Sequence, residues 1–167
     1  MANVDFPRGA IPYRGNMNVN YYDIGATAIY LYDLVERRND GLVYPAQASS
    51  ITIIGSAAEY KAASSTGRIA VYDDPNMRFL MQASDSDIDV QTDLDLVYNI
   101  VATTGNTTTK QSKHEIDSTT GAATATLPIK ILRIADVITK AGNALGANVL
   151  CEVIINNHLL KSTGVIG

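Results

Sequence analysis

The sequence predicts an all-β fold, a single small domain built as a β-barrel or a jelly-roll-like sandwich. Three observations lead to this prediction. Short runs rich in β-branched and aromatic residues recur along the chain, and clusters of Gly, Asn, Asp and Ser separate them. No long segment has the apolar spacing of an amphipathic helix. The length of 167 residues fits one domain with a core of its own.

Residues 1–22 are predicted to form an extended N-terminal arm, followed by the barrel-like domain at 23–167. Prolines, glycines and asparagines interrupt any regular period in this segment. It nevertheless holds more apolar side chains than a disordered tail, which is the alternative interpretation. We therefore expect the arm to bind a partner through three apolar side chains and two cations. These contact residues are Phe6, Ile11, Tyr13, Arg8 and Arg14.

The rest of the chain is predicted to alternate between strands and turns. The predicted strands are 28–36, 50–54, 68–72, 78–82, 96–103, 126–135 and 148–157. One helical turn is expected within 83–96, where Ser84 or Asp85 would cap it and Ile88 would pack inward. A second short turn is expected within 135–149.

Asp74-Pro75-Asn76 connects two predicted strands and fits a type I turn. Asp74 would accept hydrogen bonds from backbone N–H groups, Pro75 fixes φ at the second position, and asparagine is tolerated at the third. The alternative is a metal or acid–base site built on Asp74 and its neighbour Asp73. Such a site needs further converging ligands, which the adjacent residues do not offer. We expect a structural turn and no bound metal.

The acidic residues between positions 85 and 95 match the beginning of a calcium-binding EF-hand loop. Val90, however, stands where that loop needs glycine, and Leu96 stands where it needs a bidentate glutamate. A solvated acidic turn is the better interpretation. The polar stretch 105–117 also does not match a phosphate-binding loop, because it lacks a second glycine directly before a Lys-Ser/Thr pair. A polar loop between strands is the better interpretation.

The cysteine and histidines do not form a catalytic pattern. Cys151 alternates with apolar residues and is expected to point into the core. His114 and Glu115 are neighbours in a predicted extended segment, so their side chains would point to opposite faces. His158 has no acid or cysteine close to it in sequence. We expect no enzymatic activity and no cofactor.

Charge and hydropathy restrict the partners. The net charge of −4 disfavours non-specific binding of nucleic acid. Only 18% of the residues are charged, against about a quarter in typical domains, which favours a protein whose outer faces are partly covered by partners. No signal-like start and no membrane-length apolar run is apparent, so we expect synthesis in a cytosol and no membrane partner.

Four stretches, in a region that covers roughly 51–157, together resemble the cement, or head-decoration, proteins of tailed bacteriophages. They read AAEYKAASSTGRIAVYDDPNMRFLMQA, GNTTTKQSKHEID, ATLPIKILRIAD and ANVLCEVIINNH, in this order. The resemblance implies a β-barrel-like domain that assembles as a homodimer or homotrimer on the outside of an icosahedral capsid. The implied partner is the major capsid protein, and the implied location is the outer surface of a virion assembled in a bacterial cytoplasm.

The expected function is therefore capsid cementing: the protein binds the major capsid protein lattice across capsomers and stabilises the head against internal DNA pressure. The alternative is a carbohydrate- or receptor-binding β module of a head fibre. Such modules use exposed aromatic rings to stack on sugars, whereas this chain has no Trp and only 7% aromatic residues.

Overall fold

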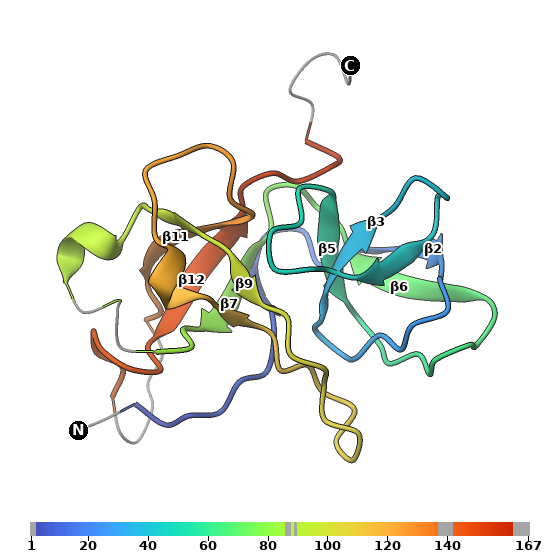
Figure 1. Cartoon of the computed structure of the whole chain (residues 1–167), viewed down its shortest axis with the longest axis horizontal. Coiled ribbons are helices and arrows are strands. Elements are labelled where there is room, and N and C mark those ends of the chain that lie inside the picture. Colours follow the sequence, from blue (N-terminus) through green and yellow to red (C-terminus); the bar gives the residue numbers. More distant parts are fainter. Residues whose placement is uncertain (1–2, 86–87, 89, 137–141, 162–167) are drawn as a thin grey trace.

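The computed structural model describes residues 3–85, 88, 90–136 and 142–161. Over these residues the chain is all β apart from two 3-10 turns, which confirms the predicted fold class. Two antiparallel five-stranded sheets and a small strand pair form a sandwich-like arrangement, with the two sheets in the left and right halves of Figure 1. Within the described part of the chain, neither helical turn has the length or hydropathy to cross a membrane.

The strands of each sheet come from distant parts of the chain. In spatial order, the first sheet contains β1 (Ile11–Arg14), β7 (Arg78–Gln82), β12 (Leu150–Ile155), β11 (Ile129–Ile134) and β8 (Val97–Tyr98). The second sheet contains β2 (Val19–Asp23), β6 (Arg68–Tyr72), β5 (Ile53–Ala57), β3 (Leu34–Arg37) and β4 (Val43–Pro45). The separate pair consists of β9 (Ile100–Val101) and β10 (Glu115–Ile116).

The predicted strands agree with the observed strands to different degrees. Strands β6 and β7 have the predicted bounds. The predicted strand 96–103 is divided into β8 and β9, which belong to different sheets. Strands β1, β2, β4 and β10 were not expected. They are short or lie at sheet edges, where the alternation of buried and exposed residues is weak.

The main core lies on the inner face of the first sheet. Phe79, Met81 and Val153 point into it, as does Cys151, in agreement with the sequence prediction. Burial raises the pKa of the Cys151 thiol to about 12, so the reactive thiolate is disfavoured. Ile100 and Ile116 of the β9–β10 pair, together with Leu34 and Ile53 of the second sheet, close the other side of this core.

The second sheet curls around a smaller core of its own. Strands β3 and β5 contribute to both cores, because Leu34 and Ile53 face the main core while Val35 and Ile54 face the smaller one. The N–H of Gly25, just after β2, donates to the carbonyl of Val43 in β4 at 2.9 Å. This bond brings the two edge strands of the sheet together at one end.

The N-terminal segment is extended, as predicted, but it pairs with both sheets. We call residues 3–23 the N-terminal strap, because β1 and β2 attach it to both sheets. The side chain of Asn3 donates to the carbonyls of Ala144 and Ala147, each at 2.8 Å. Strand β2 also spans residue 22, the predicted end of the arm. Backbone groups of the strap satisfy the edges of two sheets, which explains why the strap lies against the domain.

The expected helical turns are partly present. A 3-10 turn at Gln91–Asp93 lies within the predicted range 83–96, and Ile88 is fully buried as expected. The N-cap of this turn is Val90, whereas Ser84 or Asp85 was expected. The N–H of Val90 donates to the side chain of Asp93. In the other predicted range, 135–149, residues 137–141 lie outside the described residues, and the described ones form no helix. A further 3-10 turn, Ser118–Thr120, was not expected.

Candidate functional site

The N-terminal strap carries much of the exposed apolar surface. Among the described residues, seven large hydrophobic side chains are exposed, and four of them lie between positions 4 and 21. These four are Val4, Phe6, Met17 and Tyr21. Single exposed apolar residues are ordinary in soluble proteins, whereas a concentration in one segment is typical of a binding surface. The strap is therefore the first candidate for a protein contact.

The five predicted contact residues form two stacked pairs and one half-buried aliphatic side chain. The guanidinium of Arg8 lies 4.1 Å from the centre of the Phe6 ring. The guanidinium of Arg14 lies 4.8 Å from the centre of the Tyr13 ring. Both arginines are exposed, and Ile11 is half-buried. Cation–π stacking holds both guanidinium groups along the surface, where they remain open to a partner.

Strand pairing places Arg14 on a surface that sequence reasoning missed. In one cross-strand row, Arg14 lies opposite Arg78, Arg78 opposite Ile154, and Ile154 opposite Lys130. In the next row, Ile11 lies opposite Leu80, Leu80 opposite Glu152, and Glu152 opposite Arg133. Residues that are directly opposite point to the same side of a sheet. We call these eight residues the arginine face, which is the outward side of the first sheet.

Glu152 lies buried in the middle of the arginine face. Its side chain is 1% exposed, and Arg78 Nη1 donates to its Oε1 at 2.7 Å. Arg133 Nε lies 3.4 Å from its Oε2. A buried carboxylate needs such partners because water cannot solvate it. The arginines themselves are partly open to solvent, so N–H groups of both guanidinium forks remain available.

Arg14 belongs electrostatically to the same group. Its pKa is raised first by a hydrogen bond to Tyr13 and further by the charges of Glu152 and Asp136. The face thus has four cations around one carboxylate, on a chain whose net charge is −4. In sequence, the only signal for this arrangement is a lone Glu152 within the apolar strand 148–157.

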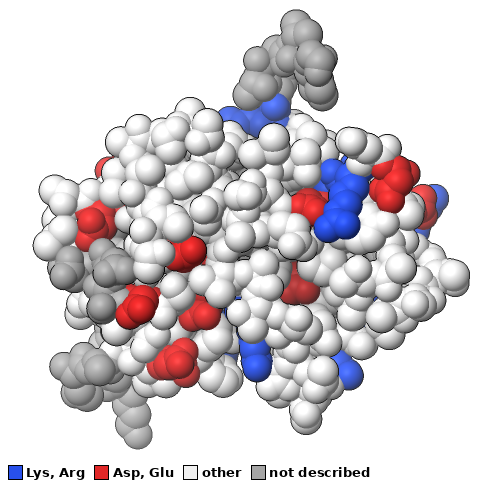
Figure 2. Space-filling model, in the orientation of Figure 1, with Lys and Arg blue, Asp and Glu red and all other residues white. Residues whose placement is uncertain are grey.

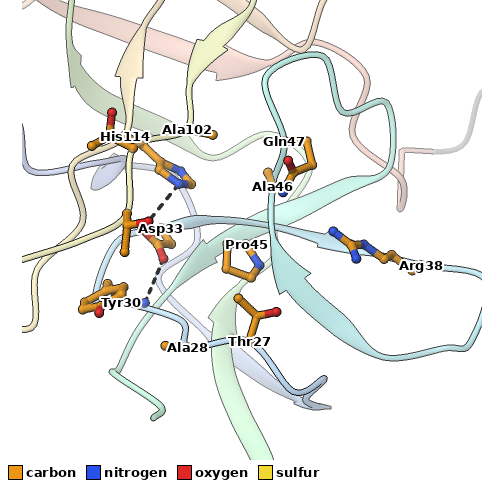
Figure 3. A pocket seen from close by; sticks show the side chains of 12 residues that line it. Thr27, Ala28, Tyr30, Asp33, Arg38, Pro45, Ala46, Gln47, Ala102 and His114 are labelled. Atoms are coloured by element: carbon orange, nitrogen blue, oxygen red, sulfur yellow. Dashed lines mark hydrogen bonds and ion pairs between the residues drawn. The ribbon is translucent and has the colours of Figure 1, made fainter. Parts of the chain in front are cut away.

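A pocket between the second sheet and the segments that flank the β9–β10 pair contains a buried acid–histidine pair (Figure 3). Its polar lining includes Thr27, Asp33, Arg38, Gln47, Thr103 and His114. His114 Nε2 lies 3.6 Å from Asp33 Oδ1, and Asp33 Oδ2 accepts a hydrogen bond from the Tyr30 N–H at 2.8 Å. Burial raises the pKa of Asp33 and lowers that of His114.

The geometry of this pair is that of a structural link. The N–H of Leu34 donates to His114 Nδ1 at 3.2 Å, so the imidazole proton is on Nε2, facing Asp33. A histidine in a catalytic triad directs one nitrogen to the acid and the other to the nucleophile. Here a backbone amide occupies the second nitrogen. The pair therefore connects β3 to the segment before β10.

The Asp74-Pro75-Asn76 segment has the hydrogen bonds of a β-turn. The carbonyl of Asp74 accepts from the Met77 N–H at 3.0 Å, and its Oδ1 accepts from the Asn76 N–H at 2.8 Å. Its Oδ2 accepts from the N–H of Asn16, which ties the turn to the strap. Asp74 thus accepts three hydrogen bonds from backbone N–H groups, two of them through its carboxylate.

Asp73, the neighbouring acid, has different partners. Its carboxylate accepts hydrogen bonds from the Asn20 side-chain amide at 3.0 Å and from the Tyr22 hydroxyl, both on β2. Desolvation, together with this hydrogen bond, raises the pKa of Tyr22. Across the described ranges, no three or more His, Cys, Asp or Glu side chains are arranged to hold a metal ion.

No model of a known protein family matches the sequence, and no curated protein is significantly similar to it. The resemblance to head-decoration proteins therefore stays a prediction. It depends on the sequence motifs quoted above, of which two form the turn after β6 and the polar segment that ends in β10.

Proposed function

We propose that this protein is a capsid cement, or decoration, protein of a tailed bacteriophage. It binds the outer surface of the major capsid protein lattice across capsomers and stabilises the head against the pressure of packaged DNA. The observation that supports this proposal most directly is the strap, with its concentration of exposed apolar side chains and stacked arginines. In this proposal the protein binds as a homodimer or homotrimer, without a cofactor and without chemical turnover.

Mass action supplies the mechanism. A ligand that binds the assembled lattice, and not the free subunits, lowers the free energy of the assembled state. Weak contacts to adjacent capsomers reinforce one another, because each contact raises the effective concentration of the next. The strap is already ordered along both sheets, so binding through its side chains loses less conformational entropy than binding through a free arm.

The test is cosedimentation with heads purified from the virus that encodes the chain. Phe6→Ser combined with Tyr21→Ser should raise the Kd for heads about tenfold or more, because exposed aromatic side chains dominate binding energies. The matched control is Ile51→Ser, since Ile51 is 64% exposed but lies outside the strap. Circular dichroism checks that all variants are folded. Deletion of residues 2–20 is unsuitable, because it removes β1 and part of β2.

Three outcomes would contradict the proposal. The first is failure of the wild-type chain to bind heads. The second is an equal loss of binding in Ile51→Ser and in the strap variant. The third is binding to a glycan array without binding to heads, which would favour the carbohydrate-binding alternative.

A further inference from the structure

We propose that the arginine face is the docking site for an acidic segment of the capsid protein surface. This inference rests on the proposed function and specifies the chemistry of the partner. The face points away from the core, and its cations are open to solvent. The exposed fractions of their side chains are 37% for Arg78, 38% for Lys130 and 54% for Arg133.

The cations are spaced to meet an extended partner that crosses the strands. Arg14 and Lys130 stand at the two ends of one row, three strands apart. Neighbouring strands are about 4.8 Å apart, so the backbones of these two residues are separated by about 14 Å. In an extended peptide, residues four positions apart are separated by about 13 Å. Two carboxylates at positions i and i+4 of the partner match this spacing.

Glu152 pre-orders the centre of the face for such a ligand. Glu152 contacts Arg78 through Nη1 and Arg133 through Nε. The other N–H groups of both guanidinium groups can therefore donate to a ligand. Guanidinium forks bind carboxylates bidentately, and a fork that is already oriented loses less entropy on binding. Glu152 is thus a positioning residue, while the cations make the contact.

Charge complementarity selects an acidic partner. The arginine face combines four cations with one carboxylate, although the whole chain is acidic. Two further carboxylates lie at the ends of the face: Asp95, 4.0 Å from Lys130, and Asp136, near Arg14. They reduce the excess of positive charge only in part. Figure 2 shows one side of the molecule, on which acidic side chains gather over the left half, where β11 and β12 lie. A basic surface on an otherwise acidic molecule directs an acidic partner to that surface and disfavours its binding elsewhere.

The aliphatic side chains favour a protein over a nucleic acid. Ile11, Leu80 and Ile154 are half-buried and lie beside the cations in the two rows. A peptide with acidic and apolar residues covers both kinds of side chain, whereas a phosphate backbone offers nothing apolar. The net charge of −4 also repels a polyanion at long range.

The experiment measures binding of the full chain to two probes, purified heads and a synthetic decamer of glutamate. The test variant combines Arg14→Glu and Lys130→Glu, which reverses the charge at both ends of the row and keeps Arg78 and Arg133, the two arginines in direct contact with Glu152. The control combines Arg37→Glu and Arg68→Glu, exposed cations of the second sheet, and makes the same change in net charge. Arg133→Gln is a second test that removes one guanidinium without adding a charge.

We expect the test variant to raise the Kd for both probes tenfold or more, and Arg133→Gln to raise it about threefold. The Kd of the control variant for each probe should stay within threefold of the wild-type value. Wild-type binding to the decamer should weaken as salt is raised.

Equal binding of heads by the wild type and the test variant would overturn this inference and leave the proposed function intact. Tighter binding of a 12-base-pair DNA duplex than of the decamer would also overturn it. If the wild type binds the decamer but not the heads, the proposed function fails, whereas the acidic-peptide site stands.

Discussion

At the scale of single residues, the structure shows how one buried charge is stabilised on a solvent-facing sheet. Glu152 is 1% exposed and has arginines from the two neighbouring strands. The exposed pair of Arg68 and Asp23 has the same chemistry without the burial, with side chains that are 67% and 65% exposed. Burial decides which of these pairs matters for stability, since exposed ion pairs contribute little.

We predict that Glu152→Gln lowers the free energy of unfolding by about 1–3 kcal/mol, because two charge-assisted interactions in a buried position are lost. Asp23→Asn should change it by less than about 0.5 kcal/mol. Urea unfolding of both variants measures the difference. Equal losses in the two variants would show that burial of Glu152 has no special effect.

At the scale of elements, the two sheets depend on close approach between strands. Gly55 in β5 has φ of +150°, and a Cβ at this position would lie 2.0 Å from the carbonyl oxygen of Tyr72 in β6. The pairing of β5 with β3 shifts register next to this residue. A glycine at such an irregularity allows both a strained backbone angle and direct contact between backbones. Gly55 is therefore required by the fold of the second sheet.

We predict that Gly55→Ala destabilises the protein by about 3 kcal/mol or more, because the added methyl group overlaps backbone atoms that cannot move independently. The control is Gly41→Ala, since Gly41 also has a positive φ, +80°, but has open space around it. Gly41→Ala should lower the free energy of unfolding by about 1–2 kcal/mol, because only its backbone angle disfavours alanine. Thermal unfolding compares the two. A smaller loss for Gly55→Ala than for Gly41→Ala would contradict this account.

At the scale of the whole molecule, both histidines of the chain are buried. His114 joins β3 and the segment before β10, and its pKa is lowered by burial, an effect that Asp33 partly opposes. The pKa of His158 is also lowered by burial and partly restored by Asp73. Each histidine therefore binds a proton less readily in the folded chain than in the unfolded chain.

We predict that the free energy of unfolding falls as the pH is lowered from 7 to 5. For a histidine whose folded pKa is depressed, the stabilisation is fully present above the unfolded value of about 6.5 and is lost as the pH falls below it. His114→Asn combined with His158→Asn keeps an acceptor for the amides of Leu34 and Leu160 but removes both titrations. This variant should lose less stability than the wild type over the same interval.

Urea unfolding at pH 7 and pH 5 measures this difference. Asp33 contributes with the opposite sign. Its pKa is raised by burial, so its protonated form favours the folded state and stability falls as the pH rises above about 4. An equal pH dependence in the wild type and the double variant would show that neither histidine controls stability in this range.

The sequence by itself determined the local features. Short runs rich in β-branched and aromatic residues predicted β6 and β7 at their observed bounds, and period-2 alternation placed Cys151 in the core. The all-β class followed from the same signal, together with the turn residues between the runs. These features are local, since they depend on residues within one strand or one turn.

Only the tertiary structure decided the rest. It attached the strap, which the sequence predicted only as an extended arm, to both sheets, and it brought Arg14, Arg78 and Arg133 together around Glu152. It also paired Asp33 with His114, whose positions are far apart in sequence. The physical reason is that strand order and register are set by packing over the whole domain, and a shift of one residue would turn each of these side chains to the opposite face.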